Sequence, residues 1–382
     1  MPVSNMPFHH PWKKVLAAAA GLALWACIAG AHGAKDHHER YDEIWRHATL
    51  YQSDQGLVRQ FALSGRLQAD YAWFDADEGD YDDARWRRFR FGFTSLLADD
   101  FTLRLEGDFD LNNSPGDFYQ RLTDAHVDWQ VGETASLKIL KHSAGFTLDG
   151  ITSSKKLLTP ERNNLTNNLW FTAEYFTGIS LAGKLDKRLS YKAGVYSSDD
   201  SDEWGVTNAS YFTHTSLGYS WASDLGLEKA QVTLDYIYND KDVDANTRDF
   251  GHVVSVSSQW QQANWGLRTD LSAGDGYYGQ SDVWGLVVMP FYSFTEMTQL
   301  VLRYTYLSSD GDNGVRLNRY ENRAVSGRGD EYDEYFAGLN LFFYGHKMKW
   351  QTGLQYTTMD DAAKDGGEYD GWGLTTGLRL YW

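Results

Sequence analysis

Basic and hydroxyl side chains gather in one stretch of the chain, residues 146–168, in a pattern suited to binding an anion. Five side chains of these types stand out, namely Ser153, Ser154, Lys155, Lys156 and Arg162. Ammonium and guanidinium groups replace the water that a phosphate or carboxylate loses when it enters a confined space. The stretch is therefore the first candidate for a functional site, and an outward surface loop of ordinary solvated lysines is the alternative.

Residue types suited to catalysis occur elsewhere but form no recognisable motif. Four histidines fall on predicted strands, namely His126, His142, His214 and His252. Spacing alone places none of them in a Ser–His–acid arrangement, and neither a phosphate-binding glycine loop nor zinc-ligand spacing is present. The N-terminal histidines His37, His38 and His47 could hold a metal, but a solvated leader explains them better. We therefore expect no catalysis, no metal and no cofactor, and the excess of acidic residues argues against nucleic-acid binding.

The candidate site lies within a long series of predicted β-strands. From Gln60 onward, apolar and polar residues alternate, which predicts about sixteen strands of membrane-barrel length. In the first strand, Leu67 and Trp73 lie on one face, and Arg66 and Asp70 lie on the other. Because the apolar face could point either into a soluble sandwich or at lipid, alternation alone does not separate the two folds.

The lengths of the connections favour a membrane barrel. Eight longer connections interleave with seven mostly shorter ones; the long connections 75–84 and 145–169, for example, are followed by short ones at 98–100 and 184–188. An up-and-down barrel with long external loops and tight periplasmic turns has this rhythm, and a Greek-key sandwich gives no reason for it. The chain also ends on Trp382, as in the C-terminal aromatic signal of outer-membrane proteins. The predicted fold is an all-β, transmembrane, antiparallel up-and-down barrel.

Residues 1–33 predict a cleaved secretory signal peptide. Lys13 and Lys14 precede an apolar run over 15–30, and the small residues Ala31 and Gly33 mark a cleavage site. The run is shorter than the roughly twenty residues that a membrane-spanning helix needs, which disfavours a retained anchor. The only cysteine of the chain, Cys27, would leave with the signal, so we expect no disulfide in the mature protein.

The rest of the chain divides into a short leader, residues 34–56, and the barrel, residues 57–382. Tyr41, Ile44 and Tyr51 share a helical stripe in the leader. The leader is therefore either a short amphipathic helix at the periplasmic mouth of the barrel or a disordered segment, and the sequence leaves both open.

Charge is unevenly distributed along the chain, whose formal net charge is −17. Acidic residues concentrate in the predicted outer loops, which suits either a lipopolysaccharide surface bridged by divalent cations or an ordinary solvated face. The face predicted to line the lumen carries ten basic residues, namely Arg66, Arg88, Arg90, Arg104, Lys138, Arg268, Arg303, Lys347, Lys349 and Arg379. Acidic residues interrupt them, which predicts facing rows of opposite sign across the barrel and a mildly basic constriction if the third loop folds inward.

Several stretches of sequence, in order, resemble the phosphate-selective porin O and P family. They are Arg87 to Phe93, Phe101 to Phe109, Leu122 to Val127, Thr152 to Lys155 with Glu161 and Arg162, and Tyr335 to Asn340. The resemblance covers nearly the whole mature chain and implies a trimeric, sixteen-stranded pore of the Gram-negative outer membrane whose third loop folds inward. It also implies a channel for phosphate or other anions, with Lys155, Lys156 and Arg162 at matching loop positions.

The function predicted from the sequence is passive diffusion of small hydrophilic solutes, with phosphate, other small anions or polar solutes generally left open as the cargo. One alternative is a non-conducting barrel that acts as an adhesin or structural protein. Its outer contact would be the seventh loop, 308–331, through Arg316, Arg319, Arg323 and Arg328. A second alternative is a hydrolase embedded in the barrel wall. Single-channel conductance separates a channel from a plugged barrel.

Overall fold

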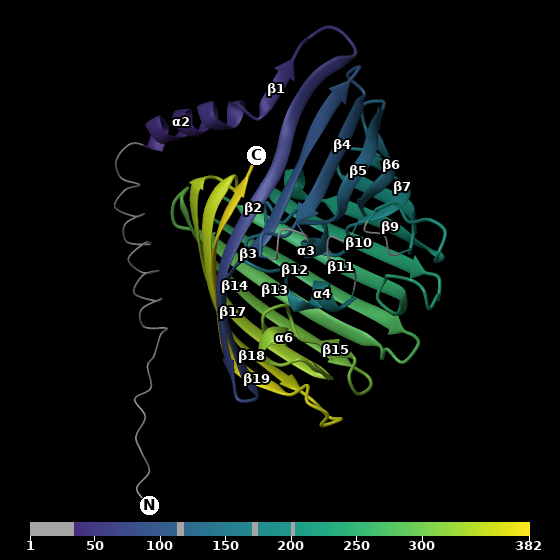
Figure 1. The fold of residues 1–382 in the computed structure, drawn as a ribbon, viewed down its shortest axis with the longest axis vertical. Helices are drawn as coiled ribbons and strands as arrows, with labels where there is room; N and C mark the ends of the chain where they lie inside the picture. Colours follow the sequence, from purple (N-terminus) through teal and green to yellow (C-terminus); the bar gives the residue numbers. More distant parts are fainter. Residues whose placement is uncertain (1–33, 113–117, 170–174, 200–202) are drawn as a thin grey trace, which may run out of the picture.

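The computed structural model describes residues 34–112, 118–169, 175–199 and 203–382, so the predicted signal peptide lies outside the described residues. Sixteen antiparallel strands form a closed barrel, in which the last strand pairs with the first from Gly371↔Ala76 to Tyr381↔Arg66 (Figure 1). The prediction of an up-and-down membrane barrel of about sixteen strands is confirmed. Within the described residues, no helix is both long and apolar enough to span a bilayer.

The barrel strands follow one another around the wall in chain order. They are β2 (Val58–Ala76), β3 (Gly79–Leu97), β4 (Phe101–Phe109), β5 (Tyr119–Val131), β6 (Ala135–Ser143), β7 (Tyr175–Lys184), β8 (Leu189–Ser197), β9 (Tyr211–Ser220), β10 (Lys229–Asn239), β11 (Phe250–Gln262), β12 (Trp265–Gly276), β13 (Val283–Ser293), β14 (Thr298–Ser309), β17 (Glu331–Tyr344), β18 (Met348–Asp360) and β19 (Tyr369–Tyr381). A short helix, α5 (Ala222–Leu225), lies in the turn between β9 and β10.

Alternation of side chains separates the two faces of the wall. In β2, Arg66, Gln68 and Asp70 are buried on the inner side of the barrel. On the outer side, apolar residues such as Leu217 and Leu271 remain 54% exposed, because no protein covers them. An outward apolar band around a polar interior is the pattern of a barrel surrounded by lipid.

The first predicted connection, 75–84, is not a long loop. The structure continues β2 and β3 through it as a hairpin that pairs Ala76 with Gly79 and leaves only Asp77 and Glu78 in the turn. Asp and Gly are poor strand formers, which is why the stretch resembles a loop in the sequence. The charged aspartate side chains are tolerated because this end of the hairpin is exposed to solvent.

Two connections fold into the barrel instead of away from it. The third-loop segment, residues 144–169, contains α3 (Leu148–Ile151) and α4 (Asn164–Leu169), and the seventh-loop segment, residues 310–330, contains β15 (Val315–Arg316), α6 (Glu321–Ala324) and β16 (Arg328–Gly329). Figure 1 shows α3, α4 and α6 within the ring of strands. Contacts agree with this placement, since α4 packs on β12, β13 and β14, and α6 packs on β2 and β3.

An apolar core fixes the two segments against the inner wall. Leu165 and Leu169 of α4 are fully buried in one cluster with Val315 of the seventh-loop segment and Leu307 of β14. The wall is indented at this point, because a Cβ atom on Gly285 of β13 would lie 2.8 Å from Cδ1 of Leu165. The two inward segments are therefore packed elements rather than loose connections.

The leader begins with a helix, α2 (Ala34–Arg46), followed by β1 (Thr49–Gln52), which pairs with β2. Figure 1 places α2 and the C-terminus at the same end of the barrel. The indole nitrogen of Trp45 donates to the backbone oxygen of Tyr381 at 2.6 Å. The leader is helical only over Ala34–Arg46, and Tyr51, predicted to share the same helical stripe, lies in β1.

Candidate functional site

The third-loop segment is fastened to the inner wall by hydrogen bonds from lumen-facing side chains. The ammonium group of Lys349 donates to the backbone oxygen of Leu157, and Asn340 Nδ2 donates to that of Leu158 at 2.9 Å. Arg303 Nη1 donates to Thr159 Oγ1 and to the backbone oxygen of Glu161, both at 3.0 Å. The middle of the segment is thereby held across the interior of the barrel.

Three of the predicted lining cations are occupied by contacts within the protein. Arg303 makes a two-pronged ion pair with Glu334, at 2.7 and 3.0 Å, and both side chains are buried. Arg379 is buried and paired with Asp70, and Lys349 is fully buried. These charges support the loop and are not presented to a passing solute.

A small cavity of about 150 Å³ lies between the third-loop segment and the wall formed by β2 to β7. Its basic lining is Arg66, Arg88, Arg90, Arg104 and Arg162, and its other lining includes Asp124, Tyr175 and the backbone stretch Gly150 to Ser154. Four of the predicted wall cations and the predicted loop arginine therefore meet at one place. We call this cavity the eyelet.

Carboxylates neutralise some of the eyelet arginines and leave others uncompensated. Glu106 pairs with Arg66 at 2.7 Å and with Arg104 at 3.1 Å. By contrast, Arg88 donates to the neutral Oε1 of Gln68 at 2.9 Å. Arg162 donates only to backbone oxygens, those of Asp149 and Thr152, at 2.8 Å each.

Within the described residues, neither Arg88 nor Arg162 has a carboxylate within ion-pair distance. Their guanidinium charges are therefore free to attract an anion into the eyelet. These two arginines, one from the wall and one from the loop, are the strongest candidates for direct contact with a solute.

The predicted serines and lysines of the loop take different positions. Ser154 is buried and accepts a hydrogen bond from Arg66 Nη1 at 2.8 Å, so it ties the loop to the wall, whereas Ser153 is exposed. The ammonium group of Lys155 lies 5.1 Å from the centre of the Tyr381 ring, and Lys156 is exposed. Burial, reinforced by the nearby Arg66 guanidinium, lowers the pKa of the Lys155 ammonium group to about 8.

A β-bulge in β3 turns an additional arginine inward. Gln68 of β2 faces Arg88, but the next residue, Ala69, faces Trp86, so Arg87 is the extra residue in the ladder. Strict alternation would place Arg87 on the lipid side, where a charge is costly. Inside the barrel it pairs with both carboxylate oxygens of Glu161 in the third-loop segment. Two adjacent arginines in a membrane strand are the signal in the sequence that points to such a bulge.

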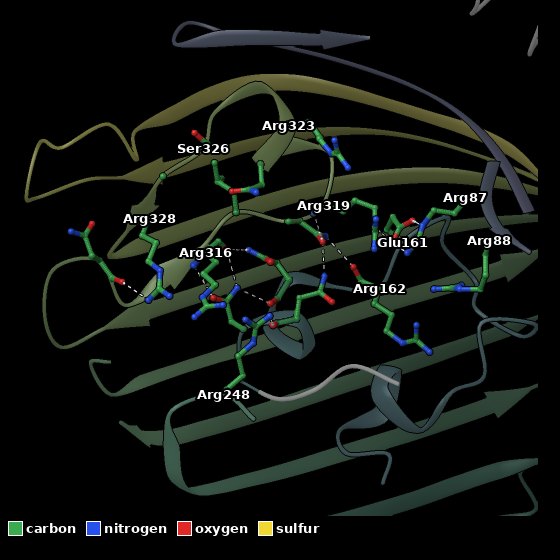
Figure 2. A pocket seen from close by; sticks show the side chains of 18 of the residues that line it. Arg87, Arg88, Glu161, Arg162, Arg248, Arg316, Arg319, Arg323, Ser326 and Arg328 are labelled. Carbon is green, nitrogen blue, oxygen red and sulfur yellow. Dashed lines mark hydrogen bonds and ion pairs between the residues drawn. The ribbon is translucent and has the colours of Figure 1, made fainter. Parts of the chain in front are cut away.

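A second cavity, of about 960 Å³, opens beside the eyelet toward the end of the barrel that carries the long loops. Among the described residues that line it, ten are arginines, namely Arg87, Arg88, Arg90, Arg121, Arg162, Arg248, Arg316, Arg319, Arg323 and Arg328. Only two of its lining residues, Glu161 and Asp365, are acidic. Figure 2 shows Arg87, Arg88 and Arg162 at one end of this cavity and Arg248, Arg316 and Arg328 at the other. We call it the vestibule.

The vestibule and the eyelet are adjacent compartments, since Arg88, Arg90 and Arg162 line both. Four vestibule arginines come from the seventh loop, whose arginines the sequence suggested as an outer contact of an adhesin. The structure instead turns them toward the interior, because Leu317, Tyr320 and Val325 of the same segment are buried against the wall. Sequence reasoning missed the inward fold of this segment, and it missed Arg121 and Arg248 as lining residues.

The rows of opposite sign expected across the barrel stay a prediction, and on the wall formed by β2 to β5 basic and acidic side chains are mixed. The register sets Arg90 opposite Asp108, but it also sets Arg66 opposite Arg90 and Glu106 opposite Asp124. Lys138 pairs with Asp128 at 3.7 Å on that wall.

The two remaining predicted lining cations lie away from the eyelet. Arg268, on β12, sits 6.0 Å from the centre of the Phe291 ring, and Lys347 lies in the short turn before β18, 5.3 Å from the Tyr344 ring. Neither lines the eyelet or the vestibule among the described residues.

One histidine does meet a serine, although the sequence alone could not show it. His142 Nε2 lies 2.8 Å from Ser180 Oγ, and His142 Nδ1 lies 2.8 Å from the backbone oxygen of Leu140. The Leu140 carbonyl occupies the position that an acidic residue takes in a hydrolase triad. The side chains of His142 and Ser180 are both at least 95% buried. Within the described residues, no cluster of three or more histidine, cysteine or acidic side chains could hold a metal ion.

A closed barrel of sixteen strands, with an apolar outer band and a polar interior narrowed by an inserted loop, defines a diffusion channel of the outer membrane. Residues 61–382 match the family described as phosphate-selective porin O and P, and the chain belongs to this family. No curated protein matches the chain.

Solved structures with the same fold include proteins of several bacteria. Salmonella typhi OmpF, solved in complex with daunomycin, is 13% identical with a TM-score of 0.62, over 87% of this chain and 100% of that chain. The anion-selective porin from Comamonas acidovorans is 11% identical with a TM-score of 0.59, over 84% and 99% of the two chains. The outer membrane channel DcaP of Acinetobacter baumannii is 13% identical with a TM-score of 0.57, over 86% and 99%.

Proposed function

We propose that this outer-membrane channel prefers anions, and that small anions such as phosphate are its cargo. The observation that carries the proposal is the vestibule, where ten arginines face two carboxylates in a chain whose formal net charge is −17. A basic cavity in so acidic a protein is not explained by composition. Low-dielectric walls strengthen its field and raise the local concentration of anions at the mouth of the eyelet.

The geometry supports a path for anions along which basic side chains lie one after another. An anion that enters the vestibule meets Arg88 and Arg162 at the boundary with the eyelet. Lys155 and Lys156 belong to the same third-loop segment but do not line either cavity among the described residues, and we propose that they act on the anion beyond the eyelet. Guanidinium groups bind phosphate oxygens with two parallel hydrogen bonds, which offsets the loss of hydration. The small volume of the eyelet favours inorganic anions over large organic ones. Ser153, Ser154, Lys155, Lys156 and Arg162 are accordingly proposed as constriction residues, with Ser154 acting through its bond to the wall.

The proposed setting of the channel is a homotrimer in a Gram-negative outer membrane. A trimer form of Vibrio cholerae OmpT, 12% identical with a TM-score of 0.52 over 84% of this chain and 99% of that chain, supports this assembly. We propose that residues 1–33 are removed on export, that 34–56 form a periplasmic leader, and that the acidic outer loops face lipopolysaccharide. We propose no catalytic role, because the buried His142–Ser180 pair is closed to substrate.

The experiment that tests the proposal measures block of the channel by phosphate in planar bilayers. Phosphate added to a chloride solution should reduce the single-channel current, because it occupies the arginines through which chloride passes. The Lys155→Glu/Lys156→Glu double variant should weaken this block and lower the preference for anions without impairing folding. A wild-type current that phosphate leaves unchanged would contradict a phosphate channel. An unchanged anion preference in the double variant would place the two lysines outside the constriction.

A further inference from the structure

Tyr344, beside the short turn between β17 and β18, lies on the outer face of the barrel wall. The register joins four residues in one row across β17, β18, β19 and β2, namely Tyr344, Met348, Leu380 and Leu67. Residues opposite one another in a sheet point to the same face. Leu67 points outward, because the side chain before it in β2, Arg66, is buried inside the barrel. Tyr344 therefore belongs to the apolar band that faces lipid.

Two aromatic residues of the leader helix α2 pack on this tyrosine. The ring centres of Tyr41 and Trp45 each lie 5.3 Å from the ring centre of Tyr344. The Tyr344 hydroxyl donates to Asp42 of α2, and Trp45 reaches the backbone oxygen of Tyr381. Figure 1 shows α2 at the end of the barrel where β19 stops. The helix is therefore held against the lipid side of the wall, at its periplasmic end.

The strand β1 continues on the same outward face. β19 stops before β2 does, and β1 pairs with the edge of β2 that is left open. The backbone nitrogen of Leu63 donates to the backbone oxygen of Ala48 at 2.8 Å, and the register sets Tyr51 opposite Phe61. Phe61 and Leu67 are an even number of residues apart in β2, so Tyr51 also points outward. Lipid offers no partner to an open sheet edge, which explains why the leader covers this one.

The leader leaves apolar side chains exposed on this outward side. Ile44, which shares the helical stripe of Tyr41 and Trp45, is 59% exposed, and Leu50 and Tyr51 are 57% and 49% exposed. These side chains lie beside the apolar band of the wall and continue it beyond the end of β19. Their neighbour is therefore the medium that surrounds the barrel, which is the bilayer.

The opposite face of α2 is charged. Glu39, Glu43 and Arg46 are exposed, and helical spacing places them away from the aromatic stripe. A helix with one aromatic and apolar stripe and one charged face lies in the plane of the membrane interface, where tryptophan and tyrosine rings prefer the headgroup level. Because the charged face carries both signs, burial of apolar surface holds such a helix, and attraction to anionic lipid does not.

We propose that the leader, over Ala34–Gln52, is a membrane anchor that lies in the headgroup region of the periplasmic leaflet, with Ile44, Leu50 and Tyr51 against phospholipid acyl chains. The partner is phospholipid rather than a second copy of the chain, because the leader continues the lipid-facing band of the wall. This inference does not depend on the proposed anion preference, since no residue of the leader lines the vestibule or the eyelet.

The test measures the accessibility of a nitroxide spin label on the exported channel, reconstituted in uncharged vesicles of phosphatidylethanolamine and phosphatidylcholine. The label is attached at Ile44→Cys or, as the matched control on the charged face, at Glu43→Cys; Cys27→Ser removes the only native cysteine. At Ile44→Cys the label should be accessible to oxygen, which concentrates in lipid, and shielded from a water-soluble nickel chelate. The ratio of the two accessibilities should exceed that at Glu43→Cys by at least about threefold.

Three results would overturn the proposal. Equal ratios at the two positions would place the leader in water. Shielding of the Ile44→Cys label from both oxygen and nickel would show that another protein chain, such as a second copy, covers this face. Shielding that appears only when phosphatidylglycerol is added to the vesicles would show that charge, rather than apolar contact, brings the leader to the membrane.

A second variant tests the contact that holds the helix in place. Trp45→Ala, added to the labelled Ile44→Cys channel, should lower the ratio toward that of the control position, because α2 loses its packing on Tyr344 and its bond to Tyr381. Trp86→Ala, which removes an exposed tryptophan of β3, should leave the ratio unchanged. Conduction by both variants shows that the barrel folds. An unchanged ratio in Trp45→Ala would overturn the assignment of this contact.

Discussion

A basic side chain on the inner wall acts on a solute only if the fold leaves its charge uncompensated. Arg303 and Arg88 both lie on lumen-facing positions that alternation identifies in the sequence. Yet Arg303 is paired with Glu334, whereas Arg88 contacts only the amide oxygen of Gln68. The lumen-facing position of each arginine could therefore be predicted from the sequence. Its ion pairing could not, because that depends on the register between neighbouring strands.

The charge of Lys155 should make anion preference depend on pH. Because the pKa of this ammonium group is lowered to about 8, it is protonated at neutral pH and loses its charge as the pH rises through that value. The groups that act on it electrostatically are Arg66, Arg104, Glu106 and Asp124. Reversal potentials measured between about pH 6 and about pH 10 should show anion preference falling near pH 8.

The matched variant for this titration is Lys155→Arg, whose guanidinium group stays charged over the whole range. Its anion preference should be constant where that of the wild type declines. A wild-type channel whose preference does not change across this range would show that Lys155 lies away from the ion path.

At the scale of elements, the narrowing of the barrel depends on two inserted segments rather than on the wall. The inward third loop follows from the family resemblance, and the mixed apolar and polar sequence of the segment is consistent with its burial. The seventh-loop segment gave no such signal, because the spacing of its buried residues, Leu317, Tyr320 and Val325, fits one face of a short helix and does not show in which direction that face packs. Their partners are distant in sequence, so only the fold shows that they point inward.

Removal of Arg303 should loosen the third-loop segment. In an Arg303→Ala variant, Glu334 is left buried without its partner and the bonds to Thr159 and Glu161 are lost. Breaking a buried pair in this way costs roughly 3–5 kcal/mol. Equilibrium unfolding in detergent micelles should show a loss of this size, and single channels should become larger and noisier.

The exposed pair of Arg59 and Asp99, at 2.9 Å, provides the comparison. An Arg59→Ala variant should lose only about 0–1 kcal/mol, because solvent screens this pair. Equal stability losses for the two variants, or normal channel noise in Arg303→Ala, would show that Arg303 does not hold the loop.

For the whole molecule, the net charge and the charge of the vestibule lining have opposite signs. The strand pattern, the closure of the barrel and, except at the first connection, the alternation of loop lengths could be predicted, because period-two alternation and connection length survive in a single sequence. The concentration of arginine in the vestibule could not, since it joins residues from 87 to 328 that come together only on closure of the barrel and insertion of the loops. A net charge of −17 therefore describes the outer surface and says little about the path of a solute.

The reversal potential of single channels in a potassium chloride gradient shows whether this acidic protein conducts anions in preference to cations. The arginines of the vestibule and eyelet predict a reversal potential close to the equilibrium potential of chloride. A reversal potential close to that of potassium would show that the acidic surface, rather than the basic interior, selects the ion, and would contradict the account.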